Sequence, residues 1–166
     1  MSCDCPSPTP VSLAGFLAFV RVQMGITQAQ LPDNSPYLQV AYCVSVEIVN
    51  AAFLTVSPLI YGLMVYNLAG SNLLNYAQDP TPIVPYPPNS DSTVGFFAYT
   101  RAQLNMLGFV SGVIQASADE STSDSLLVPD AFKEFTLMNL QQLKDQYGRT
   151  YLQFAQDYGP AAWGVS

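Results

Sequence analysis

Residues 36–78 decide the fold that we expect for this chain, and they read PYLQVAYCVSVEIVNAAFLTVSPLIYGLMVYNLAGSNLLNYAQ. Two helices are predicted here, over 36–56 and 58–78. Ser35-Pro36 and Ser57-Pro58 each place a capping residue before a proline that suits the first turn of a helix. A narrow polar stripe recurs along the first helix at spacings of 4, 4 and 3 residues, and the second helix repeats those spacings. The two stripes are Gln39, Cys43, Glu47 and Asn50, and then Asn67, Ser71, Asn75 and Gln78.

The rest of both helices is apolar or small, which inverts the pattern of a helix on the surface of a monomer. Such helices are predicted to be packed on most sides. One domain of this size supplies too few neighbours to cover both, so we expect contact between subunits. The side chains expected at helix–helix contacts or at that subunit interface are Val49, Ala52, Leu63 and Val65.

The composition supports the same expectation. The chain has 166 residues, with 5 Lys and Arg, 12 Asp and Glu, no His and a net charge of −7. Hydrophobic residues make up 49%, which excludes simple disorder, but charged residues make up only 10%, against about 25% in ordinary domains. Few groups remain to solvate a monomer's surface, so other subunits or partners are expected to cover much of it.

Several classes of function are disfavoured by what the sequence lacks. Without His there is no Ser–His–Asp or Cys–His nucleophile, and no P-loop or dinucleotide-binding glycine motif is present. Cys3, Cys5 and Cys43 are too few for a four-cysteine zinc site and are expected to be free thiols. No positive residue lies between Arg21 and Arg101, which argues against binding to nucleic-acid phosphates. We therefore expect no enzymatic activity, no cofactor and no metal.

Residues 48–66 carry no charge and come close to the length of a membrane span. Asn50, Ser57 and Pro58 interrupt the run, and no Lys or Arg flanks it nearby, as orientation in a membrane normally requires. Two helices that meet at Ser57-Pro58 explain the run better than a span. A small membrane-associated protein stays as a less favoured alternative.

The predicted fold is mainly α: one domain over 1–166, a small helical bundle with a short β-hairpin-like loop and extended Pro-rich arms. An N-terminal arm (1–11), a Pro-rich crossing segment (79–93) and a C-terminal tail (159–166) complete it. Further helices are expected at 12–24, 94–107, 136–147 and 150–158, and strands at 109–116 and 125–128 around a tip at 117–124.

Two places are predicted to bind a partner. The hydrophilic tip carries Asp119, Glu120 and Asp124, and we expect it to be mobile until a partner orders it. A calcium loop is not favoured, because the tip has no central glycine and no terminal glutamate in the required positions. At the C-terminus, Tyr158 precedes a helix stop at Gly159-Pro160, and Trp163 follows it. Trp163 is expected either to fill a pocket on a partner or to fold back onto its own subunit.

Four stretches carry a resemblance to a known group of proteins. They are YNLAGSNLLNYAQD (66–79), FAYTRAQL (97–104), DSLLVPD (124–130) and YGRTYLQFAQDYG (147–159). Together they resemble structural proteins of tailed bacteriophages, and the resemblance covers most of residues 58–159. By size and helical layout the chain is similar to the head-to-tail adaptor (connector) proteins that form a ring beneath the portal.

The resemblance implies a virion protein of the neck, assembled in the host cytoplasm as a ring of about a dozen copies. Its partners would be further copies of itself, the portal protein and the tail or nozzle proteins. DNA would pass through the channel without specific binding, and the negative charge of each copy would keep the wall from holding it. Adaptors are rarely so depleted of charge, so another tail-completion or capsid-associated virion protein remains the alternative.

Overall fold

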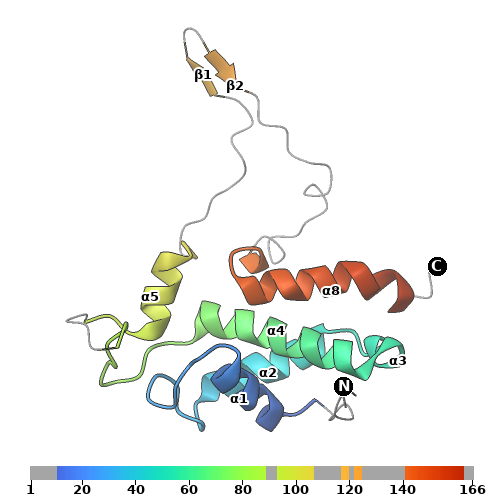
Figure 1. The fold of residues 1–166 in the computed structure, drawn as a ribbon, viewed down its shortest axis with the longest axis horizontal. Coiled ribbons are helices and arrows are strands. Elements are labelled where there is room, and N and C mark those ends of the chain that lie inside the picture. Colours follow the sequence, from blue (N-terminus) through green and yellow to red (C-terminus); the bar gives the residue numbers. More distant parts are fainter. Residues whose placement is uncertain (1–10, 89–92, 107–116, 120–121, 125–140, 163–166) are drawn as a thin grey trace, which may run out of the picture.

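The computed structural model describes residues 11–88, 93–106, 117–119, 122–124 and 141–162, and it is mainly helical, as predicted (Figure 1). Side chains are described over 11–88, 93–106 and 141–159. The helices are α1 (Leu13–Val22), α2 (Pro36–Ile48), α3 (Phe53–Val56), α4 (Pro58–Tyr76), α5 (Phe96–Gln103) and α8 (Gln146–Ala162).

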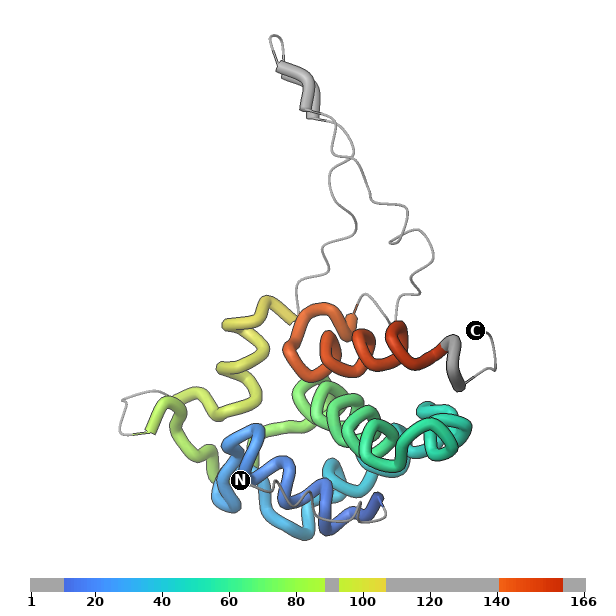
Figure 2. Tube along the Cα trace, turned by 45° about the vertical axis from the view of Figure 1, so that its right-hand side comes forward, coloured from blue at the N-terminus to red at the C-terminus, as the bar shows by residue number. Residues whose placement is uncertain are grey.

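Helix α4 is the centre of the bundle. In Figures 1 and 2, α8 lies along one side of α4, while α1 and α2 lie on the opposite side. Because α4 is apolar or small around most of its circumference, neighbours on several sides bury it. Its buried residues are Tyr61, Met64, Val65, Asn67, Leu68, Ala69, Gly70, Ser71, Leu73 and Leu74.

The described residues form two hydrophobic clusters along α4. The cluster towards the C-terminal end of α4 joins α1 and α2 to it and includes the fully buried rings of Phe16 and Phe97. The other lies at the N-terminal end, and its partly buried members on α8 include Tyr151, Phe154 and Tyr158. The buried members of this second cluster are Val49, Phe53, Tyr61, Met64, Val65 and Leu68.

The start of α2 at Pro36 and of α4 at Pro58 confirms the predicted boundaries, but the single helix over 36–56 was wrong. Helix α2 ends at Ile48, and Val49 takes an extended conformation with ψ 119°. Asn50 explains the break, because its side-chain oxygen accepts a hydrogen bond from the Ala52 backbone N–H at 2.8 Å. This local turn competes with helix continuation, as Asn side chains often do.

The predicted division of the C-terminal helices was also wrong. The break falls at residues 143–145, before α8, and α8 then continues through Gly148, Gly159 and Pro160 to Ala162. A Cβ at residue 148 would lie 2.1 Å from the Gln142 carbonyl oxygen, so glycine there permits close packing rather than ending a helix. Pro160 falls in the last turn of α8, where it removes one i→i−4 hydrogen bond, and only residues 161 and 162 follow it in the helix.

The Pro-rich segment after α4 contains no helix or strand over the described residues 77–88, and it leads towards α5. Asp79 caps α5, because its two carboxylate oxygens accept from the backbone N–H groups of Phe97 (2.9 Å) and Ala98 (3.0 Å). Tyr86 packs edge-on against Phe96, with ring centroids 5.0 Å apart. The segment is therefore fastened to the start of α5 at Asp79 and at Tyr86.

Strands β1 (Ser117–Asp119) and β2 (Thr122–Asp124) pair antiparallel, with Ser117 opposite Asp124 and Asp119 opposite Thr122. This pairing lies within the stretch that was predicted to be the tip. The strands predicted at 109–116 and 125–128, the start of the helix predicted at 136–147 and the arm at 1–10 lie outside the described residues.

Candidate interaction surfaces

Three residues of the second polar stripe, Asn67, Ser71 and Asn75, are covered by the chain itself, whereas Gln78 lies beyond the end of α4 and is exposed. Ser71 is fully buried, and its hydroxyl donates a hydrogen bond to the carboxylate of Asp145, just before α8, at 2.7 Å. One turn further along, the amide of Gln141 donates to the side-chain oxygen of Asn75 at 2.5 Å. Asn67 is also buried and donates to the Leu63 carbonyl oxygen at 2.8 Å. The stripe therefore fixes the start of α8 on α4.

Asp145 connects these two helices. Its carboxylate accepts hydrogen bonds from Ser71 and, at 2.8 Å, from the backbone N–H of Gly148 in the first turn of α8. It thus acts as a helix cap while being fully buried. Burial raises the pKa of Asp145 above its ordinary value, and the hydrogen bonds from Gly148, Ser71 and Tyr147 oppose that rise.

The polar stripe of α2 faces solvent. Gln39, Cys43 and Glu47 are exposed, and Asn50 leaves the stripe because it forms the turn that follows the helix. The side chains beside this stripe are apolar as well as exposed, which is unusual for a helix of a monomer. No described helix covers this face of α2 as α8 covers α4.

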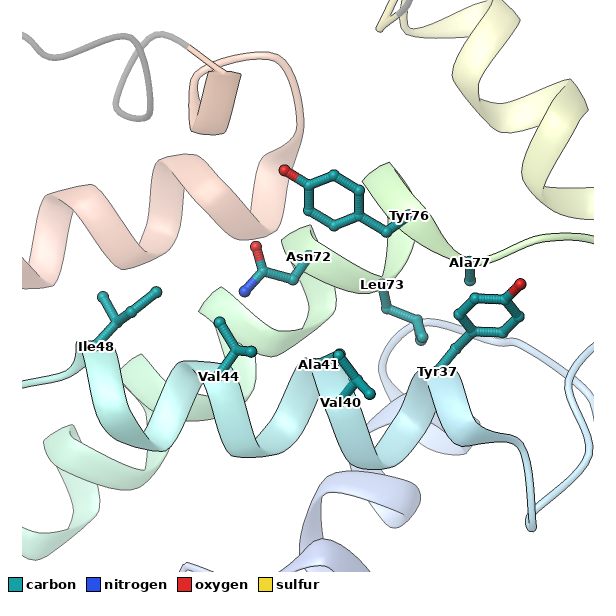
Figure 3. A pocket seen from close by; sticks show the side chains of 9 residues that line it. All are labelled: Tyr37, Val40, Ala41, Val44, Ile48, Asn72, Leu73, Tyr76 and Ala77. Atoms are coloured by element: carbon teal, nitrogen blue, oxygen red, sulfur yellow. The ribbon is translucent and has the colours of Figure 1, made fainter.

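An apolar groove lies beside that stripe, between α2 and α4, and its cavity measures about 240 Å³. Val40, Val44 and Ile48 recur every four residues along α2, and Figure 3 shows them along the side opposite Asn72 and Tyr76 of α4. Val40 is 60% exposed and Tyr76 is 72% exposed. We call this surface the α2–α4 groove; its lining is Tyr37, Val40, Ala41, Val44, Ile48, Asn72, Leu73, Tyr76 and Ala77.

The polar atoms at the base of the α2–α4 groove bind one another. Asn72 donates to the Ser45 hydroxyl oxygen at 3.1 Å, and Ser45 donates to the Ala41 carbonyl oxygen at 2.8 Å. These bonds hold α2 and α4 together. They also occupy the hydrogen-bonding groups of Asn72 and Ser45 that a ligand in the groove could otherwise bind. The groove therefore offers mainly apolar contact.

A second exposed apolar cluster lies where α3 meets α4. Leu54 and Val56 on α3 and Leu59 in the first turn of α4 are all exposed, and Leu59 is 57% exposed. Residues 48–78, which include this cluster and the α4 side of the groove, carry no charged side chain. We call this cluster the α3–α4 corner.

The three described arginines bind backbone carbonyl groups within the chain, and Arg149 does so at the Leu143 carbonyl oxygen, 3.2 Å away. Arg21 donates to the carbonyl oxygens of Ile26 (2.7 Å) and Leu31 (2.6 Å) and pairs with Asp33 at 2.5 Å. Arg101 donates to the carbonyl oxygen of Leu74 at 2.7 Å and also to that of Ala77. Burial lowers the pKa of Arg101, while the Asp79 charge opposes that shift. These guanidinium groups stabilise loops and helix ends.

The residues predicted at a subunit interface divide into two pairs. Val49 and Val65 are 3% and 0% exposed and belong to the hydrophobic cluster at the N-terminal end of α4. These two side chains therefore make contacts inside the chain, which is one of the two kinds of contact expected for them. Ala52 and Leu63 are half-buried, and their place at an interface stays a prediction.

Three of the five residues predicted to bind a partner are described, and they lie on the β1–β2 pair and on α8. Asp119 lies on β1 and Asp124 on β2, whereas Tyr158 is half-buried on α8, with its ring centroid 6.3 Å from that of Phe154. Tyr158 therefore packs partly against its own chain. Glu120 and Trp163 lie outside the described residues, so their predicted roles stay predictions.

Among the described residues, no group of three or more His, Cys, Asp or Glu side chains is placed to hold a metal ion. In the same part of the chain, no helix combines the length and the apolar character that a membrane crossing requires. Comparisons with protein-family models, curated proteins and solved structures gave no match for this chain.

Sequence reasoning missed the α2–α4 groove and the buried Asp145. The groove has a signal, since Val40, Val44 and Ile48 follow one another at helical spacing directly beside the polar stripe. Asp145 also has one, because an Asp three residues before Gly148 can cap a helix that begins between them. Both signals depend on knowing where α8 begins and which helix it covers.

Proposed function

We propose that this chain is a structural virion protein of a tailed bacteriophage, a head-to-tail adaptor subunit of the neck. Copies of it form a ring of about a dozen members that joins the portal to the tail or nozzle proteins and lines the DNA channel. The observation that supports this most strongly is the α2–α4 groove, an exposed apolar seam in a chain with only 10% charged residues.

Exposed apolar surface between helices is costly in water, and its burial against another protein is favourable. The centres of protein interfaces are depleted of charged residues, and residues 48–78 carry none. A net charge of −7 on each copy repels the phosphates of DNA, which suits a channel through which DNA passes without specific binding.

Another tail-completion or capsid-associated virion protein is the second candidate, and the low charge favours it because adaptors rarely have so little. It also requires self-association or a virion partner, so the groove supports both proposals. They differ in the position of the chain within the particle. A small membrane-associated protein is the third candidate, and the described helices do not favour it because none is long and apolar enough to span a bilayer.

Two measurements on the full chain test the proposal. Light scattering on the purified protein should give a mass about a dozen times the 18.0 kDa of one chain. Gold-labelled antibodies against the chain should mark purified phage particles at the junction of head and tail. Labelling of the capsid surface or the tail tip would favour the second candidate. Absence from particles, together with a monomer in solution, would contradict both virion proposals.

A further inference from the structure

We propose that the α2–α4 groove of one copy receives the α3–α4 corner of the next copy. This inference rests on the self-association in the proposed function and names the two surfaces that meet. Leu54, Val56 and Leu59 of one chain would lie against Val40, Val44, Ile48 and Tyr76 of its neighbour.

Shape favours this pairing. The groove is concave, with a cavity of about 240 Å³, which exceeds the roughly 150 Å³ of apolar cavity that can hold a benzene molecule. It has room for a large aliphatic side chain such as Leu59. The α3–α4 corner lies where a four-residue helix meets the first turn of α4, so its side chains are carried on a bend of the backbone.

Charge favours it as well. The α3–α4 corner and the α4 wall of the groove both come from residues 48–78, which contain no charged side chain. On the α2 side, Glu47 lies next to the groove residue Ile48, is exposed and belongs to the polar stripe. An apolar centre with a polar edge is the arrangement found in specific protein interfaces.

The exposed area favours a contact between different surfaces over a contact between two grooves. The groove exposes four large apolar side chains, Val40, Val44, Ile48 and Tyr76, whereas a standard interface takes about 20–30 residues from each partner. Two grooves facing each other would bury only those side chains and would leave the corner exposed. When each copy uses both its groove and its corner, both of these apolar surfaces are covered.

The positions of the two surfaces determine the kind of assembly. Leu59 lies at the N-terminal end of α4 and Tyr76 at its C-terminal end, about 25 Å apart at 1.5 Å per residue. A contact between separated surfaces of identical chains is heterologous, so it repeats from copy to copy and produces a closed ring or an open filament. This agrees with the ring that the proposed function requires.

The test uses two variants of the full chain, Val44→Asp in the groove and Leu59→Asp in the corner. Both side chains are exposed, so neither substitution removes a core contact, and unchanged melting temperatures will verify this. Val40→Asp and Leu54→Asp replace them if either variant melts at a lower temperature. Val22→Asp, at an exposed position on α1, is the matched control and should assemble like the wild type.

Each single variant should give the 18.0 kDa mass of a monomer by light scattering, because each lacks one of the two surfaces. An equimolar mixture of the two should give twice that mass, since the intact groove of one variant can still bind the intact corner of the other. Further growth is blocked by the remaining charged surfaces.

Other outcomes would overturn the inference in distinguishable ways. If Leu59→Asp assembles like the wild type and the mixture forms no dimer, then the groove binds another groove. If neither substitution reduces the mass of the wild-type assembly, then the ring uses different surfaces and the proposed function survives. If the wild type is a monomer at every concentration and is absent from particles, then the proposed function fails together with this contact.

Discussion

The two polar stripes have the same spacing in the sequence and opposite surroundings in the structure. On α4, Asn67 and Ser71 are buried beneath α8, and Ser71 binds the carboxylate of Asp145. On α2, Cys43 and Glu47 are exposed to solvent. The difference shows that a stripe of four polar residues on an apolar helix does not say what covers it. A matching polar group on a neighbouring helix decides that, and α8 supplies one to α4.

A charge introduced at equivalent positions of the two stripes should change the free energy of unfolding by very different amounts. Ser71→Asp would place a second carboxylate beside the buried Asp145, and it should destabilise the fold by about 3–5 kcal/mol, the usual cost of an unpaired buried charge. Cys43→Asp stands at the matching position of the exposed stripe and should change the free energy of unfolding by less than about 0.5 kcal/mol. Urea denaturation measures both, and equal effects would contradict the difference in burial.

The start of α8 should be more sensitive than its end. Gly148→Ala would bring a Cβ against the Gln142 backbone and should cost about 1–3 kcal/mol, because backbone cannot move aside as easily as a side chain. Gly159→Ala meets nothing within 4 Å and should stabilise α8 by about 0.4–1 kcal/mol. Thermal unfolding of the two variants compares them directly. If both substitutions raise the melting temperature, then the start of α8 does not pack closely against the backbone of residue 142.

The buried carboxylate should make stability depend on pH. Because burial raises the pKa of Asp145 in the folded state, the folded chain holds a proton that the unfolded chain has already released. The contribution of Asp145 to the free energy of unfolding therefore falls as pH rises from the ordinary pKa of 3.8 to the raised pKa, and it is constant at higher pH. Asp145→Asn should remove this slope while keeping a side-chain oxygen that can cap α8. Urea denaturation at several pH values in this range measures the slope. If the stability of Asp145→Asn depends on pH as that of the wild type does, then other groups cause the dependence.

The turn after α2 should have the smallest effect. Asn50→Ala removes the hydrogen bond to the Ala52 N–H and should cost about 1 kcal/mol, the typical value for one such bond. Gln39→Ala, in the exposed part of the same stripe, is the control and should be nearly neutral. A neutral Asn50→Ala would mean that the break in the helix is imposed by packing at Val49 and Phe53.

The mainly helical fold could be predicted because the local signals agree with the final structure. Ser57 and Pro58 start α4 as the capping pattern indicates, with the Ser57 hydroxyl accepting from the Ile60 N–H at 3.4 Å. The break after Ile48 was missed because apolar spacing continues across Asn50, while its side-chain bond to Ala52 works against the helix. The path of α8 through Gly148 was missed because glycine there serves close packing with residue 142.

The interaction surface was only partly predictable. Low charge and inverted stripes indicated contact with other chains, but they could not separate Val65, which is buried in the chain's own core, from Val44, which faces the groove. That distinction depends on which face of α4 receives α8, a contact between residues 74 apart in the sequence for Ser71 and Asp145. Such long-range pairings are not encoded in the periodicity of either helix.

Hydroxyl-radical footprinting, read by mass spectrometry, tests most directly whether another copy covers the α2–α4 groove. The assembled protein is compared with protein dissociated by dilution or by Val44→Asp. Oxidation of Tyr76, which is 72% exposed in the single chain, should fall several-fold on assembly, while Val22, 78% exposed on α1, should stay equally oxidised. Equal oxidation of Tyr76 in the assembled and dissociated protein would contradict the account, because the groove would then be exposed to solvent in both.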